Sequence, residues 1–392
     1  MVAARYAAFA LALAACALAS CSGGGSASPP PLAGGSGASG STPAPGTTAT
    51  PAPGTTPGTT PAPSPAPTGT PASHGVVPLG SYAIDPSKVF VAGISSGGFF
   101  GVQMHVAHSA TFKGAAIYAG GVYWCSGAGQ AAQALTACGG EGLYAPMLTP
   151  SETYLDQQSA SGTIDPESNL QGQPVYLWSG TADTVVKQAA MNDLQTEYQH
   201  YGARIVRYDN AFPAEHGWES PDGELPCGTA ASPYMIRCTL GTSTYDSESV
   251  WMTAFFGTLA ARNNGTLSGT LLNVDQTAFG AGASNSMDTN GYLFVPADCA
   301  AHATCGLLIA FHGCLQTQAD IGTKFVTESG IDEWADRNHV VVLYPYAVKS
   351  TTVPYNPQGC WDWWGYDDEN YATKSGTQIS IVYKMVQHVM GH

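Results

Sequence analysis

Runs rich in apolar residues recur along the chain from about residue 74 to its end, and helix-forming segments separate them. Apolar runs bounded by glycine or polar residues predict buried strands, and they lie at 89–92, 114–119, 174–178, 204–208, 307–311 and 340–344. The predicted helices cover 97–108, 187–201, 325–337 and 378–390. Alternating apolar strands and helices are typical of a mostly parallel central sheet with helices on both faces. We therefore expect a single α/β domain over 74–392.

Residues 22–73 differ from the rest of the chain because they consist almost entirely of Gly, Ser, Pro, Thr and Ala. Such a segment has little to bury and cannot offset the entropy lost on ordering. Its proline content makes it a semi-extended spacer that reaches about 3 Å per residue. We predict a disordered linker here, ahead of the α/β domain.

Residues 1–21 are predicted to form an export signal. Arg5 gives a weak positive start, and residues 7–19 form an apolar run that is too short to span a bilayer stably. The small residues before Cys21 and the flexible tail after it resemble a bacterial lipobox, in which Cys21 would carry the lipid. The alternative is ordinary cleavage nearby and a freely secreted chain. We expect an exported protein, either extracellular or anchored at the cell envelope, with this lipid as its only link to a membrane.

The chain has a formal net charge of −15 and only 13 Lys and Arg residues among its 392. Nucleic-acid binding needs clustered cations that neutralise phosphates, so we exclude that class of partner. Charged residues make up only 10% of the chain, which suits the weakly charged surface of a secreted protein. No CxxC pair or HExxH motif occurs, and we expect neither a metal nor another cofactor. We expect a monomer.

Eight cysteines remain when Cys16 and Cys21 are set aside from the ten in the chain. An even number in an oxidising compartment indicates disulfides, although eight cysteines allow about 105 pairings. Local spacing favours three short-range pairs and leaves one long-range pair. The predicted pairs are Cys125–Cys138, Cys227–Cys238, Cys299–Cys305 and Cys314–Cys360.

Ser95 is the candidate nucleophile because the segment 93–97 reads G-x-S-x-G between a predicted strand and a predicted helix. A nucleophile on a sharp strand-to-helix turn needs small neighbours, and Gly93 and Gly97 provide them. The chain contains 47 glycines, so the pattern alone is easily matched by chance. The strand before it and the helix after it make the prediction specific.

A serine needs a base to remove its proton, and that base needs an acid to orient it. Asp183 follows the end of the predicted strand 174–178, and His216 lies on a loop beyond the next helix and strand. The order Ser, Asp, His is that of α/β-hydrolases. Asp183 could instead cap the helix after it, and Asp209 is a rival acid that is nearer to His216 but lies on a different strand. We predict a catalytic triad of Ser95, Asp183 and His216.

A tetrahedral oxyanion needs two backbone N–H donors. Ser96 would supply one, and the second would come from the His312-Gly313-Cys314 segment that follows the strand 307–311. In the usual α/β-hydrolase that strand precedes the nucleophile, whereas here it follows the whole triad. We therefore predict a circularly permuted α/β-hydrolase, closed by the strand 89–92 lying beside 340–344.

These motifs together resemble those of poly(3-hydroxybutyrate) depolymerases of the circularly permuted type, over nearly all of 75–392. The matching segments are 89–98, 180–183, His216, His312-Gly313-Cys314 and 359–364. The resemblance implies the triad Ser95, Asp183 and His216, and oxyanion donors at Ser96 and Cys314, with Cys314 held by a disulfide. It also implies an aromatic-lined cleft for a polyester chain, for which the candidate substrate contacts are Trp361, Trp363, Trp364 and Tyr366.

The resemblance thus predicts a serine esterase that cleaves poly(3-hydroxybutyrate)-type polyesters to 3-hydroxy acid monomers and oligomers through an acyl-enzyme. One rival is a carbohydrate esterase that removes feruloyl or acetyl groups from polysaccharides. A rival from another class is a surface lipoprotein that binds polymer through its tryptophans without catalysis. Each candidate tryptophan could also be a core residue, since tryptophan is usually well buried.

Overall fold

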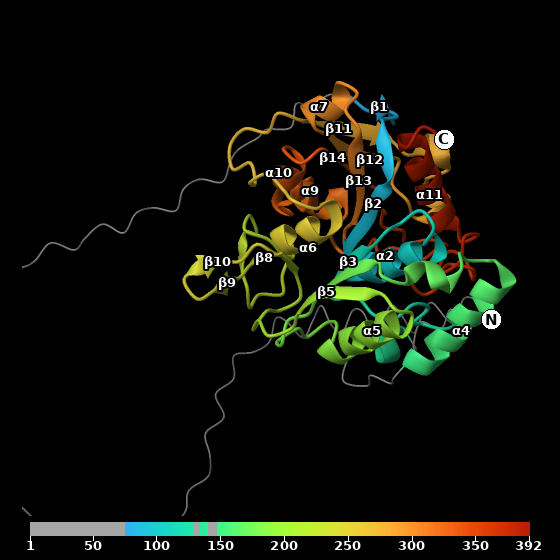
Figure 1. Cartoon of the computed structure of the whole chain (residues 1–392). Coiled ribbons are helices and arrows are strands. Elements are labelled where there is room, and N and C mark those ends of the chain that lie inside the picture. The colour runs from blue at the N-terminus through green and yellow to red at the C-terminus, as the bar shows by residue number, and fades with distance from the viewer. Residues whose placement is uncertain (1–74, 129–133, 140–146) are drawn as a thin grey trace, which may run out of the picture.

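The structure is a computed structural model that describes residues 75–128, 134–139 and 147–392 (Figure 1). The predicted export signal, its Cys21 and the predicted linker lie outside the described residues, so they stay predictions. No helix in the described part of the chain is long and apolar enough to cross a bilayer.

A nine-stranded sheet runs through the whole molecule. All its strands are parallel except β12, which is antiparallel to both of its neighbours. In spatial order the strands are β1 (Val77–Pro78), β11 (Thr270–Asp275), β12 (Asn290–Val295), β14 (Val340–Tyr344), β13 (Cys305–Phe311), β2 (Ile84–Ile94), β3 (Ala115–Tyr118), β4 (Pro174–Trp178) and β5 (Arg204–Asp209). The prediction of a mostly parallel sheet is confirmed.

Strand β2 does not lie beside β14, and the prediction that 89–92 would pair with 340–344 is wrong. Strand β13 lies between them, with Leu307 opposite Val89 and Leu308 opposite Val342. The chain first extends the sheet from β2 through β3 and β4 to β5, and the C-terminal half then extends it the other way. Because β14 pairs with only one edge of β13, the other edge is free to receive β2.

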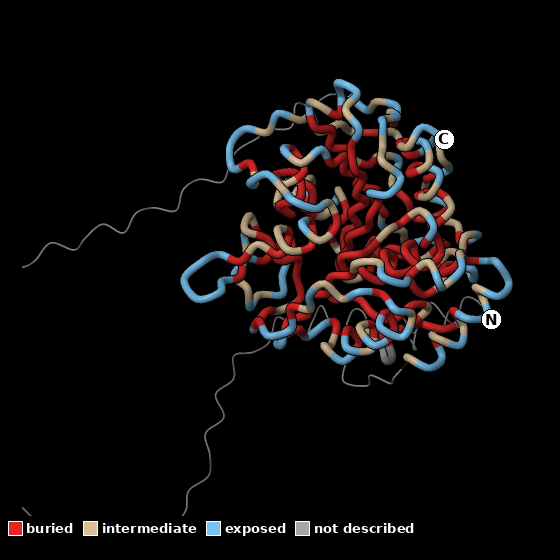
Figure 2. Tube along the Cα trace, in the orientation of Figure 1, coloured by how far each residue is buried: buried red, intermediate tan, exposed pale blue. Residues whose placement is uncertain are grey.

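The core lies on both faces of the sheet, since alternate residues of the central strands enter different apolar clusters. In β2, Val89 and Val91 belong to one cluster, while Phe90 and Ala92 belong to the other. Figure 2 shows the buried residues gathered along the sheet, with exposed loops around them. Near-continuous apolar strands of this kind are typical of a sheet that is covered on both faces.

Helices cover each face of the sheet. The first cluster includes buried residues of α2 (Ser96–Ala107), α4 (Leu148–Ser161), α5 (Gln188–His200) and α11 (Thr377–Val389). The second includes residues of α6 (Ser247–Phe256), α9 (Lys324–Glu328) and α10 (Ile331–Ala335). In Figure 1, α2 and α11 accordingly lie on one side of the central strands, and α6, α9 and α10 on the other.

Shorter elements complete the domain. They are α7 (Ala297–Ala300), α8 (Gln318–Ile321), η1 (Ala134–Gly139), η2 (Glu167–Leu170), η3 (Thr277–Phe279), η4 (Ala283–Asn285), the small sheet of β6 (Trp218–Glu219), β8 (Met235–Arg237) and β7 (Leu225–Pro226), and the hairpin of β9 (Thr239–Leu240) and β10 (Ser243–Thr244).

The helix predicted over 325–337 is two helices, α9 and α10. Gly330 separates them with a φ of 75°, in the left-handed region that favours glycine. A side chain would not fit there, since a Cβ on Gly330 would lie 2.9 Å from Ser220 Oγ.

The four predicted disulfides are all present. They join Cys125 to Cys138, Cys227 to Cys238, Cys299 to Cys305, and Cys314 to Cys360. The last one spans 46 residues and ties the loop after β13 to the segment before α11.

Candidate active site

Ser95 lies on the turn between β2 and α2, at the carboxyl edge of the parallel strands. Its φ of 56° and ψ of −124° are outside the regions that a residue with a Cβ normally occupies. The turn is held by neighbouring backbone bonds, since the Ser95 N–H donates to Tyr118 O at 3.0 Å and the Phe99 N–H donates to Ser95 O at 2.9 Å. Backbone strain that its surroundings maintain is common at functional sites. The predicted nucleophile therefore sits on the sharp turn that the G-x-S-x-G pattern requires.

Gly93 and Gly97 are required in this turn because backbone carbonyl oxygens lie too close to them to leave room for a Cβ atom. A Cβ on Gly93 would lie 2.1 Å from Gly97 O, and a Cβ on Gly97 would lie 2.3 Å from His312 O. The second contact brings the Ser95 turn directly against the end of β13. The predicted nucleophile and the predicted oxyanion segment are therefore neighbours.

Asp183 and His216 are hydrogen-bonded, with 3.0 Å between Asp183 Oδ2 and His216 Nδ1. Their side chains are 2% and 6% exposed. The other oxygen, Asp183 Oδ1, accepts the N–H groups of Val185 and Val186, each at 2.8 Å. The carboxylate is thus fixed by the backbone on one side and can hold the imidazole in one tautomer on the other.

The loops that carry Asp183 and His216 are packed together. The Ala182 N–H donates to Ala214 O at 3.1 Å. A Cβ on Gly180 would lie 2.0 Å from the same carbonyl, so only glycine fits at that position. This packing brings the end of β4 and the loop after β5 within reach of each other.

Asp209, the rival acid, has different partners. Its Oδ2 accepts the hydroxyls of Tyr176 at 2.8 Å and Tyr245 at 2.6 Å, and its Oδ1 pairs with Arg207 Nε at 2.6 Å. It therefore anchors β5 to β4 and to the segment before α6. Asp183 is the carboxylate placed to act on His216.

Within the described residues, no hydrogen bond joins Ser95 Oγ to His216. Catalytic hydrogen bonds are often long or poorly aligned until a substrate binds, so this geometry does not exclude the pair. The segment around His216 also reaches the predicted oxyanion loop. Tyr234 has its ring centroid 6.2 Å from that of His216, and its neighbour Pro233 accepts a hydrogen bond from Gln316 at 2.8 Å.

The two predicted oxyanion donors have unengaged amides. In the part of the chain that the structure describes, neither the Ser96 N–H nor the Cys314 N–H has a hydrogen-bond partner, whereas those of Ser95, Gly313 and Leu315 are all engaged. The Ser96 amide is in the first turn of α2, where N–H groups lack intrahelical partners and favour an anion. Two such donors on facing segments can receive one oxyanion.

His312 supports the predicted oxyanion loop as a neutral side chain. Burial lowers its pKa to about 4. Its Nδ1 lies 2.7 Å from Gly313 O, and its Nε2 lies 3.1 Å from the Ala347 N–H, so the neutral ring carries its proton on Nδ1. Burial likewise lowers the pKa of His105 and of His108 to about 4, and both pack inside the helical layer.

The four predicted substrate contacts are buried in this structure. Their exposed fractions are 0% for Trp361, 8% for Trp363, 5% for Trp364 and 4% for Tyr366. Trp361 stacks on Phe100 with 4.8 Å between ring centroids, and its backbone N–H donates to Ser96 Oγ at 3.4 Å. Trp361 thus has no surface open to a polymer in this structure, and the contacts of these four side chains with a substrate stay a prediction. Trp361 is a core residue that supports the nucleophile turn.

Two residues near the site were not singled out from the sequence. Tyr234 lies beside His216, and Gln316 joins Gly313 of the predicted oxyanion loop to Pro233, the residue before Tyr234. Neither carries a local sequence signal, because each owes its place to contacts with a distant segment.

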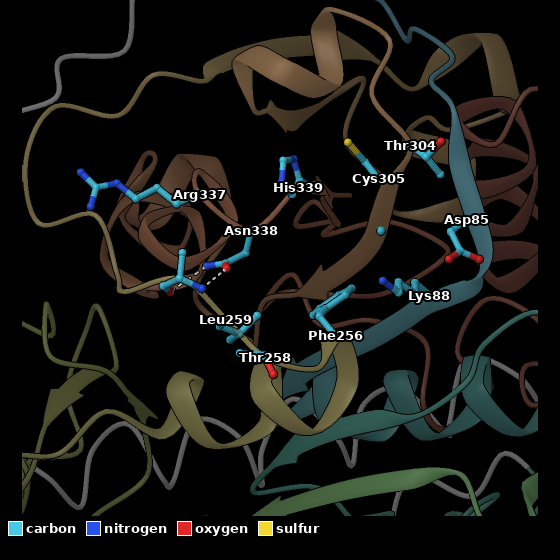
Figure 3. A pocket seen from close by; sticks show the side chains of 12 residues that line it. Asp85, Lys88, Phe256, Thr258, Leu259, Thr304, Cys305, Arg337, Asn338 and His339 are labelled. Atoms are coloured by element: carbon cyan, nitrogen blue, oxygen red, sulfur yellow. Dashed lines mark hydrogen bonds between the residues drawn. The ribbon is translucent and has the colours of Figure 1, made fainter.

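A cavity of about 480 Å³ lies at the opposite, amino-terminal edge of the sheet (Figure 3). Asp85 and Lys88 at the start of β2 line it, together with Cys305 at the start of β13. No predicted catalytic residue is among its lining residues. Ligands of parallel α/β sheets bind at the carboxyl ends of the strands, which is where Ser95 and Asp183 lie.

The sheet order, the serine on its strained turn and the aspartate–histidine pair beyond β4 define an α/β-hydrolase with the layout of a serine hydrolase. No family model matches the chain. It is 38% identical over 324 residues to the poly(3-hydroxybutyrate) depolymerase of Delftia acidovorans, with 81% of this chain and 62% of that protein covered. It is 35% identical over 327 residues to the polyhydroxybutyrate depolymerase of Talaromyces funiculosus, with 80% of this chain and 92% of that protein covered. The chain belongs to the polyhydroxybutyrate depolymerase family.

Two solved structures are also similar. One is a polyhydroxybutyrate depolymerase in which a serine is replaced by alanine, complexed with an R3HB trimer, with a TM-score of 0.72 and 30% identity. The other is the depolymerase from Penicillium funiculosum, with a TM-score of 0.71 and 30% identity. Each match covers 80% of this chain and 99% of the solved chain. The resemblance to this family is therefore confirmed.

Proposed function

We propose that this chain is a serine esterase that hydrolyses poly(3-hydroxybutyrate)-type polyesters to 3-hydroxy acid monomers and oligomers. The observation that carries the proposal is the Asp183–His216 hydrogen bond at the same sheet edge as the strained Ser95 turn. The substrate class is supported by family membership and by the solved relative complexed with an R3HB trimer. The chain covers only 62% of the Delftia relative, so what that whole protein does is carried over here as a proposal.

In the first step, His216 takes the proton of Ser95 as Ser95 Oγ attacks the ester carbonyl carbon. Asp183 holds the imidazole in the tautomer with Nδ1 protonated and stabilises the imidazolium that forms. The N–H groups of Ser96 and Cys314 stabilise the negative charge on the former carbonyl oxygen. When the ester C–O bond breaks, His216 returns the proton to the departing alkoxide, which leaves as a hydroxyl-ended fragment.

In the second step, His216 takes a proton from water, and the hydroxide attacks the acyl-enzyme. The bond to Ser95 Oγ breaks, the serine regains the proton, and a 3-hydroxy acid or oligomer is released. These steps need a nucleophile, a base, an orienting acid and two N–H donors, and the proposal assigns each of these roles to a described residue.

We also propose export, because four disulfides suit an oxidising compartment. Lipid attachment at Cys21 and a monomeric state remain predictions. Growth with labelled palmitate, comparing the wild type with Cys21→Ala, tests the lipid directly.

The experiment that tests the proposed function measures clearing of a poly(3-hydroxybutyrate) suspension by the purified protein beside its Ser95→Ala variant. Release of ferulate from a feruloylated polysaccharide is measured in parallel. Clearing by the wild type, with none by the Ser95→Ala variant, supports the proposal. Ferulate release without clearing would assign the chain to the carbohydrate esterases. If the wild type shows neither activity, the remaining candidate is a protein that binds polymer without catalysis.

A further inference from the structure

In the loop after β13, the backbone N–H groups on both sides of Cys314 are hydrogen-bonded, and within the described part of the chain that of Cys314 is not. The Gly313 N–H donates to Gln316 Oε1 at 2.6 Å, and the Leu315 N–H donates to Gln358 O at 2.8 Å. The Cys314 N–H between them has no partner among the described residues. The amide proposed to bind the oxyanion is therefore held between two amides that are fixed.

Gln316 makes contacts on both sides of the site. Its side chain is buried, with 1% of the residue exposed. While Oε1 accepts from Gly313, Nε2 donates to Pro233 O at 2.8 Å, across 83 residues of sequence. The next residue, Tyr234, accepts the Trp218 N–H at 2.8 Å, and its ring lies beside His216. One amide side chain thus joins the oxyanion loop to the segment that packs against the predicted base.

The loop needs such a restraint because of its backbone conformation. Leu315 has a φ of 59°, in the left-handed region that is unfavourable for a residue with a Cβ. A Cβ on Gly313 would lie 3.0 Å from Gln316 Oε1 and 3.1 Å from Ser95 Cβ. Gln316 and the nucleophile therefore contact the same glycine, and a shift of the Gln316 side chain would change the distance between Ser95 and Cys314.

We propose that Gln316 is a positioning residue that sets the Cys314 N–H relative to Ser95 and His216. The proposal rests on the proposed function, since it concerns the same ester-cleaving site. Gln316 acts through the backbone and not on the substrate. Its effect falls on the transition state, when the carbonyl oxygen becomes negative and the oxyanion donors must be in place.

The first test compares Gln316→Met with Gln173→Met in the purified protein. Gln173 is a matched control, because it also bridges two groups, His105 Nε2 at 2.6 Å and Ser109 O at 3.0 Å, but lies just before β4 at the opposite sheet edge. With a soluble 3-hydroxybutyrate trimer ester, Gln316→Met should lower kcat by about 10- to 100-fold, with KM changed by less than about threefold. Gln173→Met should leave both values near those of the wild type, even where both variants lower the Tm.

The second test uses Gln316→Glu, which has the same shape and remains informative if the methionine variant does not fold. A neutral carboxyl can accept from Gly313 and donate to Pro233, as glutamine does, whereas a carboxylate cannot donate. The ratio of kcat in the variant to kcat in the wild type should therefore be near one at acidic pH and fall as the pH rises. The wild type carries the same other ionisable groups around this loop, His216, Asp183, His312 and Asp320, so the ratio isolates the effect of the introduced carboxyl group.

These tests separate the two proposals. A wild type that cleaves no ester would remove the proposed function itself. A wild type that is active beside a Gln316→Met variant with unchanged kcat, or a Gln316→Glu ratio that is independent of pH, would refute only the role of Gln316. Equal losses of kcat in Gln316→Met and Gln173→Met would also refute it, since they would show general destabilisation.

Discussion

Replacing Asp183 by asparagine should remove most of the activity while leaving the fold intact. In the wild type, Oδ1 accepts two backbone N–H groups, those of Val185 and Val186, each at 2.8 Å. An asparagine keeps these two hydrogen bonds only if its carbonyl oxygen takes the position of Asp183 Oδ1. Its NH₂ group then replaces Oδ2, 3.0 Å from His216 Nδ1. The opposite orientation would place NH₂ against two N–H donors and is disfavoured.

The consequence is the wrong tautomer of the base. With an NH₂ group facing it, His216 Nδ1 must accept, so its proton moves to Nε2, which can no longer take the proton of Ser95. A comparable replacement in a serine protease lowers kcat by about 10⁴-fold. That is about 5 kcal/mol of transition-state stabilisation. We expect a loss of this size for Asp183→Asn.

The assay is hydrolysis of a soluble 3-hydroxybutyrate oligomer ester, with thermal unfolding followed in parallel. Asp209→Asn is the matched control, because Asp209 is buried and hydrogen-bonded to two tyrosines and Arg207 but not to His216. It should lower the Tm and leave kcat within about threefold of the wild type. A kcat for Asp183→Asn within tenfold of the wild type, or a larger loss in Asp209→Asn, would refute the assignment of the acid.

Three further changes have expected outcomes. Ser95→Ala should abolish clearing of a polyester suspension and leave the thermal melt unchanged. Gly97→Ala should lower the Tm and the activity together, because its Cβ would lie 2.3 Å from His312 O, and an unchanged Tm would contradict the close approach. Burial raises the pKa of Glu197 to about 8 from its ordinary 4.5, so the folded chain holds this proton more tightly than the unfolded chain does. That stabilisation is complete below the ordinary pKa and is lost as the pH rises through about 8. Between pH 5 and pH 9, the Tm of Glu197→Gln should therefore fall less steeply than the Tm of the wild type, because the variant has no carboxyl group to deprotonate at this position. Equal slopes in the two proteins would contradict this prediction.

The strands of the parallel core could be predicted because they are short apolar runs buried on both faces. The predicted 174–178 and 340–344 coincide with β4 and β14. Strands β11 and β12 were not predicted, since they lie toward one edge of the sheet and several of their residues are only half-buried. Their apolar pattern is weaker because less of their surface must be covered.

The order of the strands was harder to predict than their positions. Residues 89–92 and 340–344 are both fully apolar, so nothing in either segment says which neighbour it prefers. The pairing with β13 is decided by the whole sheet and by backbone contacts such as that of Gly97 with the end of β13. Long-range arrangements of this kind leave no local signal.

The candidate site could be predicted in part. The aspartate and histidine come together as the order of motifs implied, because each follows the end of a parallel strand at one sheet edge. The role of the tryptophans near 361 could not be decided from the sequence, because composition cannot distinguish an aromatic cleft from an aromatic core, and their contact with substrate stays a prediction. Gln316 was overlooked because its importance lies in two partners, one of them 83 residues away.

Covalent labelling with a fluorophosphonate, followed by mass spectrometry of the peptides, tests most directly whether an imidazole-activated serine carries the reaction. We expect the label on Ser95 alone, with labelling strongly slowed in a His216→Ala variant. Labelling of a different serine, or labelling of Ser95 at the same rate without the His216 imidazole, would contradict the account.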